Sequence, residues 1–449
     1  MTKQIVTKQI KTRPIPDQIV QVPGSKSISH RMMICAALSN GSSKIRNLLQ
    51  SQDLTLTAKA LTAMGADIIQ LEPNLVCVQG FNGRPTPHET PIFLGNSGTS
   101  MRLLAGIAGL GQTVYTLTGD ERMCERPMVE LLDALNGFQV KAWSQNPGGT
   151  PPVCIKGGSR QGGYTQIDCS KSSQYLSSLL MMGALMEQGL TITLPTPPVS
   201  VPYIDLTIDV MNQFNVTAHR ISDQEYKVPG NQKYESGEYV VEPDLSNAGY
   251  FWAAGAITGS EIGVDNIKKT SLQGDLKQIL ILEKMGCLLN IGKNSVGVKG
   301  KPLNGNPFKG STLKGTHLKG TSLKGTSLKG IDVDMSDTPD AVPAIAVVAA
   351  FAKGTTRIAN IGHLRVKECD RIEAVSSQLI KMGITVTQGD DWLEIIGGTP
   401  KGAFIETFND HRIAMAFSVA GLLVEGMVIE NPTCVEKSFP GFWDIFEAL

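Results

Sequence analysis

The sequence predicts a mixed α/β protein built from repeated units. First, an apolar-periodic helix, followed by a Gly or Asn cap and a short alternating strand, recurs five times. Second, further strand-like segments flank these helices. Third, a chain of 449 residues has room for two or three domains of about 150 residues each.

The five helix copies are evenly spaced, with one exception. Their caps lie near Gly65, Gly137, Asn215, Gly286 and Gly383. By subtraction, the intervals are 72, 78, 71 and 97 residues. The last interval contains a pentad repeat of 23 residues, FKGST-LKGTH-LKGTS-LKGTS-LKG, at 308–330, and without it the interval is 74. We therefore expect six units, the sixth completed by the chain ends, and a low-complexity insertion.

The insertion is too short for a structure of its own. Four to five pentads make about one turn of a pentapeptide coil, which cannot bury a core. We interpret 308–330 as a loosely ordered surface excursion. The near-duplicate TKQIV-TKQIK at the N-terminus is interpreted as a solvated tail or an edge strand.

Strands are expected around the helices, and one helix is expected to be fully buried. The strand segments are VYTLTG, VCIKG, LTITLP, EIGVDNI, TTRIANI and MVIENP. The longest apolar stretch, 341–352, falls well short of the roughly 20 residues of a membrane span and predicts a buried helix.

Composition argues against several classes of partner. Lys and Arg together number 41, as do Asp and Glu, so the chain as a whole attracts neither nucleic acid nor an anionic membrane. Eight single Cys and six His give no metal-ligand spacing, so we expect reduced thiols, no metal and no cofactor. No apolar stretch follows the N-terminal lysines, so we expect no secretory signal and a cytoplasmic protein.

Three small, polar turns run directly into apolar helices. They are Pro23-Gly24-Ser25-Lys26-Ser27, Gly95-Asn96-Ser97-Gly98-Thr99 and Ser170-Lys171-Ser172-Ser173-Gln174. The free N–H groups and the dipole of a helix start attract anions, although Ser, Thr and Asn are also ordinary N-caps. Basic residues at the same places, Lys26, Arg31 and Arg102, favour anion binding. No nucleotide-binding glycine motif is present, which argues against ATP or NAD.

Further charged clusters are less specific. Arg122 to Pro127 and Arg365 to Arg371 could be solvated loops with surface ion pairs. Asn409 to Arg412 opens an apolar helix, and Lys437 precedes Ser-Phe-Pro-Gly. His411 taken alone is more typical of a structural histidine with satisfied hydrogen bonds.

Nine ordered motifs together resemble the 3-phosphoshikimate 1-carboxyvinyltransferases, or EPSP synthases. The motifs are PGSKSISHR, GNSGTSMR, ERMCERP, SKSSQYLSSLLM, PYIDLT, TPDAVP, RVKECDRI, FNDHRIAM and EKSFPGFW. The resemblance implies a two-domain inside-out α/β barrel with three βαβαββ units in each domain. It places one domain at 25–243 and the other at 1–24 with 244–449, and it implies a monomer that closes around its substrates.

The resemblance also implies the site residues. Shikimate 3-phosphate would contact Lys26, Ser27, Arg31, Ser172, Ser173, Gln174, Ser200, Tyr203, Asp340, His363 and Lys367. Phosphoenolpyruvate would contact Lys26, Asn96, Gly98, Thr99, Arg126, Gln174, Lys367, Arg371, Arg412 and Lys437. The pattern departs at His363, where some members have Asn, and at the pentad insertion.

The implied reaction is an addition followed by an elimination. Asp340 would take the proton of the 5-hydroxyl, while Glu368 would protonate the methylene carbon of phosphoenolpyruvate and later remove a proton. Lys26 would assist the departing phosphate. Glyphosate competes with phosphoenolpyruvate in this family, and Gly98 leaves room for it, so we predict sensitivity.

Two alternatives have different requirements. A sister enolpyruvyl transferase acts on a UDP-amino sugar and carries a Cys in a mobile loop, where this chain has Cys124. The motifs around Lys26 and Ser172 fit shikimate phosphate better. A non-catalytic binding or scaffold protein would not need both Asp340 and Glu368.

Overall fold

The prediction of a mixed α/β protein is confirmed. The computed structural model describes residues 6–158, 160–301 and 327–449. All six predicted strand segments are strands: β7 (Val114–Thr118), β9 (Val153–Lys156), β11 (Leu190–Thr193), β15 (Ile262–Asp265), β19 (Thr355–Ala359) and β23 (Val428–Glu430). The predicted buried helix is α9 (Val342–Ala350), in which every residue is buried.

Six small sheets repeat one topology. In the first half the strand orders are β14-β3-β5-β4, β6-β7-β9-β8 and β10-β11-β13-β12. The strands not yet given are β14 (Glu238–Val240), β3 (Ser42–Arg46), β5 (Leu75–Gln79), β4 (Asp67–Glu72), β6 (Ile92–Phe93), β8 (Lys141–Ser144), β10 (Gly163–Gln166), β13 (Glu225–Val228) and β12 (His219–Ser222). In the second half the strand orders are β2-β15-β17-β16, β18-β19-β21-β20 and β22-β23-β1. Their remaining strands are β2 (Gln18–Val20), β17 (Ser295–Lys299), β16 (Leu288–Ile291), β18 (Asp332–Asp334), β21 (Leu393–Ile396), β20 (Thr385–Gln388), β22 (Phe404–Ile405) and β1 (Thr7–Gln9). Each four-stranded sheet has one parallel pair followed by two antiparallel pairs. The N-terminal edge strand β1 completes the sixth sheet, which has three strands among the described residues.

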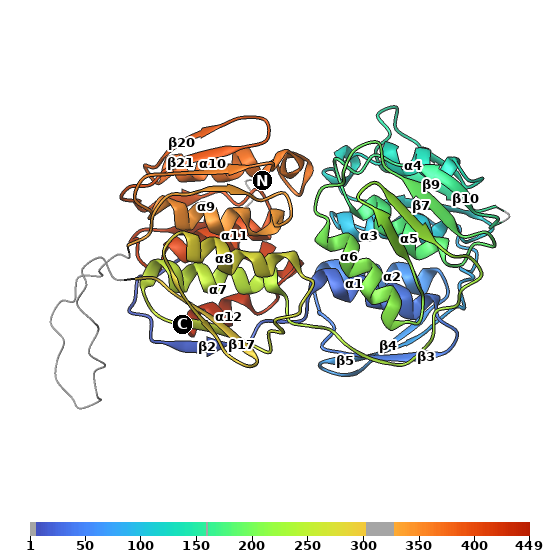
Figure 1. Cartoon of the computed structure of the whole chain (residues 1–449), viewed down its shortest axis with the longest axis horizontal. Coiled ribbons are helices and arrows are strands. Elements are labelled where there is room, and N and C mark those ends of the chain that lie inside the picture. Colours follow the sequence, from blue (N-terminus) through green and yellow to red (C-terminus); the bar gives the residue numbers. More distant parts are fainter. Residues whose placement is uncertain (1–5, 159, 302–326) are drawn as a thin grey trace.

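Helices fill the interior of each half, and the sheets surround them (Figure 1). The central helices are α1 (Lys26–Leu38), α3 (Gly98–Ala108), α5 (Gln174–Gly183), α7 (Leu245–Thr258), α9 and α11 (His411–Ala420). Almost every residue of these helices is buried, as expected for helices that are apolar or small all round. The α-helices that keep exposed residues on one side are α2 (Gln52–Ala63), α4 (Val129–Asn136), α6 (Pro202–Gln213), α8 (Lys277–Lys284), α10 (Arg371–Lys381) and α12 (Phe442–Glu447).

The chain has two separate hydrophobic cores. One contains buried residues from 28 to 241, and the other contains buried residues from 10 to 22 and from 245 to 449. The predicted two-domain α/β fold is confirmed. We propose the predicted limits, 25–243 for the first domain and 1–24 with 244–449 for the second, as the domain boundaries.

Two crossing segments connect the domains, and they are hydrogen-bonded to each other. The Ser25 amide donates to the Glu242 carbonyl at 2.7 Å, and the Asp244 amide donates to the Pro23 carbonyl at 2.8 Å. At Gly24 a Cβ atom would lie 1.9 Å from the Asn47 carbonyl oxygen, so only glycine fits. The paired crossings place the start of α1 beside the start of α7.

Four of the five predicted caps have the left-handed backbone of a helix C-cap. Gly65, Asn215, Gly286 and Gly383 have φ values between +60° and +105°. Gly137 is the C-cap of α4 as predicted, but its backbone is right-handed, with φ −62°. There the chain stays right-handed beyond α4 and turns at Gln139, with φ +71°, before β8.

The C-terminal end of the predicted insertion belongs to the fold. Residues 308–326 lie outside the described residues, but Leu328 is 3% exposed and packs in the second core. The Lys329 amide donates to the Met285 carbonyl at 3.0 Å, and the Lys353 amide donates to Leu328 at 2.8 Å. Because Leu328 packs in the second core, residues 327–330 belong to the fold. The predicted surface excursion at 308–330 is therefore wrong for these four residues.

Candidate active site

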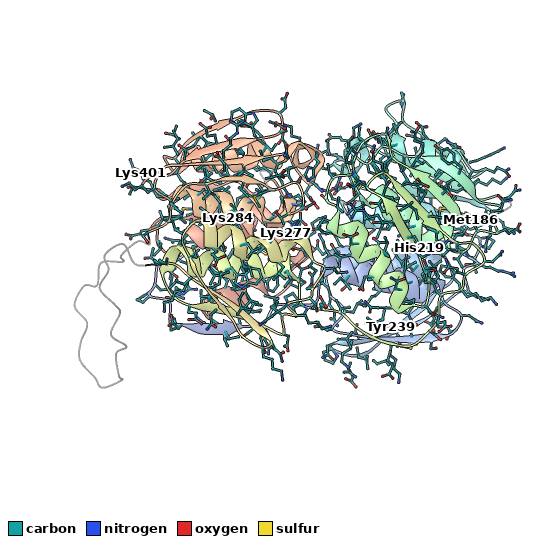
Figure 2. The ribbon with its side chains drawn as sticks, in the orientation of Figure 1. Met186, His219, Tyr239, Lys277, Lys284 and Lys401 are labelled. Carbon is teal, nitrogen blue, oxygen red and sulfur yellow. The ribbon has the colours of Figure 1, made fainter. Side chains whose placement is uncertain are left out.

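A narrow polar cleft lies between the two domains. Its walls come from both halves: Lys26, Ser27, Gly98, Thr99, Arg102, Arg126, Ser172, Ser173, Gln174, Val199, Ser200, Tyr203, Pro339, Asp340, Lys367, Glu368, Arg371 and Arg412. Figure 2 shows Lys277 on the side of the second domain that faces the first domain, and the ammonium of Lys277 lies 2.7 Å from the Asp337 carboxylate. The cleft brings together most of the predicted site residues.

The first domain contributes the starts of its three central helices. Lys26 and Ser27 begin α1, Gly98 and Thr99 begin α3, and Gln174 begins α5. The side-chain amide of Gln174 donates to the Thr99 hydroxyl at 2.9 Å, and this hydrogen bond fixes the starts of α5 and α3 relative to each other. Three helix N-termini with their positive dipole ends converge on one cleft, an arrangement that favours phosphate binding.

Basic side chains reinforce this face. Arg102 donates to the Gln174 side-chain oxygen at 2.9 Å, and its guanidinium lies 5.4 Å from the ring centre of Tyr175. Arg126 donates to the Asn96 side-chain oxygen at 3.1 Å. Both guanidiniums are nearly fully buried yet border the cleft, so they can form charge-assisted hydrogen bonds to an incoming anion.

The second domain contributes an ion-pair network around Arg371, the first residue of α10. Its guanidinium lies 2.9 Å from Asp340, 2.8 Å from Glu368 and 2.7 Å from Asp410. Arg412 lies 2.6 Å from the other oxygen of Asp340. Asp410 also caps α11 by accepting from the Arg412 amide, so one set of contacts aligns the starts of α10 and α11.

These cations keep the two predicted catalytic carboxyls ionised. Burial raises the pKa of Asp340, but Arg412 and Arg371 outweigh it and hold that pKa well below its usual range. Burial likewise raises the pKa of Glu368, but Arg371 and Arg126 hold it well below its usual value. Without substrate, Glu368 is therefore a carboxylate and carries no proton to donate.

The cleft also lowers the pKa of a cation. Burial lowers the pKa of Lys367 to about 8, with Arg371 adding to this effect and Asp340 opposing it. Lys367 carries its charge reversibly near neutral pH, whereas the guanidiniums beside it stay charged.

A lysine closes the cleft from the second domain. Lys437 donates to the Asn96 carbonyl at 2.7 Å and lies 3.1 Å from Asp53, and both partners belong to the first domain. Asp53 is also 3.5 Å from Lys26. Burial raises the pKa of Asp53, but Lys437 and Lys26 outweigh it and lower that pKa. The ammonium of Lys437 therefore holds the two domains together at the edge of the cleft.

Four predicted site residues do not line the cleft. Lys437 and Asn96 form the cross-domain contact at its edge. Arg31 is buried behind Ser27, whose carbonyl accepts from it at 2.9 Å. His363 is buried, and its Nε2 has no hydrogen-bond partner among the described residues. Burial and Lys367 lower the pKa of His363 to about 3, so it is neutral.

Two acidic residues near the site were not predicted. Arg102, in contrast, lines the cleft as its position at a predicted anion-binding helix start suggested. Asp53 and Asp275 gave no sequence signal, because their partners lie far away in the chain. His411 is fully buried and does not line the cleft, and its Nδ1 lies 3.4 Å from Asp410 Oδ1, although neither ring nitrogen has a hydrogen-bond partner among the described residues.

The rival hypothesis of a cysteine in the active-site loop gains no support from the geometry. Cys124 lies 3.8 Å from the Gly119 carbonyl and is not one of the described residues that line the cleft. Within residues 6–158, 160–301 and 327–449, no group of three or more His, Cys, Asp or Glu is arranged to hold a metal ion. In the same part of the chain, no helix is both long and apolar enough to cross a membrane.

Comparisons with known proteins agree on one family. The sequence model described as "EPSP synthase (3-phosphoshikimate 1-carboxyvinyltransferase)" matches residues 13–446. A 3-phosphoshikimate 1-carboxyvinyltransferase of Methanococcus aeolicus is 39% identical over 437 residues, covering 96% of this chain and 95% of the relative. One from Vibrio cholerae is 39% identical over 436 residues, covering 96% of each. The structure of an EPSP synthase from Acinetobacter baumannii aligns with a TM-score of 0.77 at 27% identity, covering 99% of this chain and 98% of that one.

The fold and cleft define a two-domain α/β protein with a polar, basic cleft that suits anionic ligands. The chain belongs to the EPSP synthase family, whose members are 3-phosphoshikimate 1-carboxyvinyltransferases. The predicted family, enzyme class and place in aromatic amino-acid biosynthesis are confirmed.

Proposed function

We propose that this chain transfers the carboxyvinyl group of phosphoenolpyruvate to the 5-hydroxyl of shikimate 3-phosphate in the cleft between its domains. The observation that carries the proposal at residue level is the meeting of three helix starts from one domain with the Asp340 and Glu368 ion pairs of the other. The first set suits phosphate binding, and the second supplies the acid–base groups.

We place shikimate 3-phosphate against the hydroxyl-rich wall. Its phosphate would contact Ser172, Ser173 and the α1 start at Ser27, and its ring would lie toward Tyr203 and Asp340. Arg31 would act indirectly, because it holds the Ser27 carbonyl and does not reach the cleft. The remaining predicted contacts of this substrate are Lys26, Gln174, Ser200, His363 and Lys367.

We place phosphoenolpyruvate against the basic wall. Its phosphate and carboxylate would lie among Arg126, Arg371, Arg412 and Lys26, above the helix start at Gly98. Asn96, Thr99, Gln174, Lys367 and Lys437 complete the predicted set. Each charge-assisted hydrogen bond stabilises the bound anion by about 1.5–3 kcal/mol, which offsets repulsion between the two substrates.

In the addition step, Asp340 accepts the 5-hydroxyl proton as the oxygen attacks the carbon that bears the phosphate group. Glu368 gives a proton to the methylene carbon, which becomes a methyl group. In the elimination step, Glu368 removes a methyl proton, the double bond re-forms, and phosphate leaves beside Lys26 and takes up the proton that Asp340 had accepted. One carboxyvinyl ether and one phosphate are formed from the two substrates.

The substrate itself would prepare Glu368 as an acid. In the free protein, Arg371 and Arg126 outweigh burial and hold its pKa low. Phosphoenolpyruvate brings a carboxylate and a phosphate to the same cations, and its negative charge raises the pKa of nearby carboxyls. Glu368 would therefore acquire its proton only in the substrate complex.

The first experiment is mass spectrometry of the product from the two substrates, with phosphate release measured in parallel and no metal or nucleotide added. We expect a carboxyvinyl adduct and equimolar phosphate. Absence of product together with normal binding of shikimate 3-phosphate would instead indicate a binding or scaffold protein.

The amino-sugar alternative is tested by replacing the acceptor with a UDP-amino sugar and by alkylating Cys124. We expect no transfer to the UDP-amino sugar and retention of most activity toward shikimate 3-phosphate after alkylation. We also propose a cytoplasmic monomer, because each core is completed within one chain. Light scattering measures the oligomeric state directly.

A further inference from the structure

A buried carboxyl lies directly behind the proposed base Asp340. Asp275 is part of the short helix η2 (Gly274–Leu276), is 4% exposed and does not line the cleft. The Tyr203 hydroxyl bridges the two carboxyls: its oxygen is 3.3 Å from Asp275 Oδ2 and 3.3 Å from Asp340 Oδ2. No predicted role involved Asp275.

The number of hydrogens in this bridge shows which carboxyl is neutral. A tyrosine hydroxyl has one hydrogen and can donate to only one of two ionised carboxylates. Asp340 is held as an anion by Arg371 at 2.9 Å and Arg412 at 2.6 Å, so it is the acceptor. Asp275 can then satisfy the bridge only if it carries a proton and donates it to the Tyr203 oxygen.

The other oxygen of Asp275 supports the same assignment. Asp275 Oδ1 is buried and has no hydrogen-bond partner among the described residues. A buried, unpaired oxygen is far less costly on a neutral carboxyl than on a carboxylate, which concentrates negative charge there.

The charged groups around Asp275 also favour the neutral form. Asp340 from η3 (Pro339–Ala341) and Asp244 at the start of α7 face it as anions, and Arg412 from α11 is the cation that opposes them. Arg412 is already paired with Asp340. Burial, followed by the charge of Asp340, raises the pKa of Asp275 to about 7.

We propose that Asp275 is a positioning residue that holds a proton and donates it to Tyr203, so that the Tyr203 hydroxyl always donates to Asp340. This inference rests on the proposed role of Asp340 as base. Arg412 and Tyr203 then occupy both lone pairs of Asp340 Oδ2, while Arg371 occupies one on Oδ1. The remaining lone pair on Oδ1 is left to receive the substrate proton.

Ionisation of Asp275 makes it compete with Asp340 for the single Tyr203 hydrogen. In the wild type we expect kcat/KM, which reports the free enzyme, to fall above about pH 7 as Asp275 loses its proton. Asp275→Asn cannot ionise, but its amide still donates to Tyr203, so the part of this fall that begins near pH 7 should disappear, and only the later fall from Lys367 near pH 8 should remain. Substrate phosphate ionisation is the same for both proteins and cancels in their ratio.

Asp275→Ala is the matched control that removes the donor as well as the charge. We expect kcat/KM of D275N to stay at least about tenfold above that of D275A at pH 6.5, which is the scale of one hydrogen bond to a charged partner. Equal losses in D275N and D275A would overturn the proposal, because they would mean that Asp275 acts as an anion. Melting temperatures of both variants show whether either has lost its fold.

A measurement other than activity can test the role of Asp275 independently of the proposed role of Asp340. With 13C-labelled aspartate carboxyls, NMR of the free protein should show one carboxyl titrating near pH 7 that is missing in D275N, and Tyr203→Phe should shift that titration. If Asp340→Asn keeps full turnover, the base assignment fails while the NMR titration still stands. If D340N is inactive and the titration is absent, the assignment of Asp275 fails alone.

Discussion

The two walls of the cleft handle charge in different ways. The first-domain wall presents helix starts and hydroxyls with the cations Lys26, Arg102 and Arg126, and the one carboxylate that pairs with them among the described residues is Asp53. The second-domain wall presents carboxylates that are already paired with arginines, above all around Arg371. The first wall is therefore ready to receive anions, whereas the second has its charges balanced before any substrate arrives.

This difference assigns two tasks to two domains. An unpaired cation binds an incoming phosphate without first losing another partner, which suits ground-state binding. A carboxylate fixed by guanidiniums keeps its position and protonation state, which suits proton transfer. We therefore expect changes to the paired carboxylates of the second-domain wall to reduce kcat, and changes to the anion-binding groups of the first-domain wall to raise KM.

The largest effect is expected for Glu368→Gln. The amide keeps the shape of the side chain but cannot exchange a proton with the methylene carbon, so kcat should fall about 10²–10⁴-fold. In D2O, deuterium entry into the methylene group should be lost as well. Ser173→Ala on the opposite wall is the control, and it should raise KM for shikimate 3-phosphate with a much smaller change in kcat. A similar loss of kcat in both variants would contradict the division between the walls.

Arg371→Met tests the balanced charges of the second wall. It leaves Glu368 and Asp410 buried without their guanidinium partner, so the free energy of unfolding should fall by about 3–5 kcal/mol. The control is Lys44→Met, which breaks an exposed pair with Glu238 and should cost less than about 1 kcal/mol. Urea denaturation measures both. Equal stability of the two variants would show that the network around Arg371 is not a structural unit.

Gly98→Ala tests the space on the first wall. Its Cβ atom would lie 2.5 Å from a terminal nitrogen of Arg126, so this guanidinium must move away from the phosphoenolpyruvate position. We expect KM for phosphoenolpyruvate to rise about tenfold, the loss of roughly one charge-assisted hydrogen bond, and glyphosate to be weakened at least as much. Gly148→Ala is the matched control, because a Cβ there meets nothing within 4 Å. Unchanged inhibition of G98A would remove the steric explanation.

Lys367 should make substrate binding at the second-domain wall depend on pH. Its pKa, lowered to about 8 mainly by burial, means that the charge is present below pH 8 and is lost as the pH rises through that value. Substrate affinity of the free enzyme should therefore fall severalfold between pH 7 and pH 9, with proton uptake on binding near pH 8. Lys367→Arg keeps its charge and should remove this fall, which calorimetry in two buffers can measure. An identical fall in the variant would assign the titration to another group.

Much of the fold was predictable because it is local. A cap such as Gly286 and a strand such as Ile262–Asp265 are determined by neighbouring residues, and both occur where they were predicted. The backbone conformation at a cap is less local: Gly137 caps α4 in a right-handed conformation, because the path from α4 to β8 places the left-handed turn at Gln139.

The site was predictable only where it was carried by motifs. The helix starts at Lys26, Gly98 and Gln174 bear their chemistry in consecutive residues. Asp53 and Lys437, by contrast, meet across 384 positions of sequence, and no short pattern records such a contact. Asp275 gave no signal for the same reason, because its role depends on a hydroxyl and a carboxylate from two other segments.

The smallest effect is expected for removal of residues 308–326, which are outside the described residues and contain none of the cleft motifs. We expect kcat and KM to stay within about threefold and the melting temperature to change little, since insertions between packed elements have weak effects on stability. Extending the deletion through Gly330 also removes Leu328 from the second core, which should lower the free energy of unfolding by about 2–5 kcal/mol. Thermal melts of the two deletions, compared side by side, measure this difference. If the shorter deletion also unfolds the protein, the pentads are part of the second domain, and if both are harmless, the packing of Leu328 does not matter for stability.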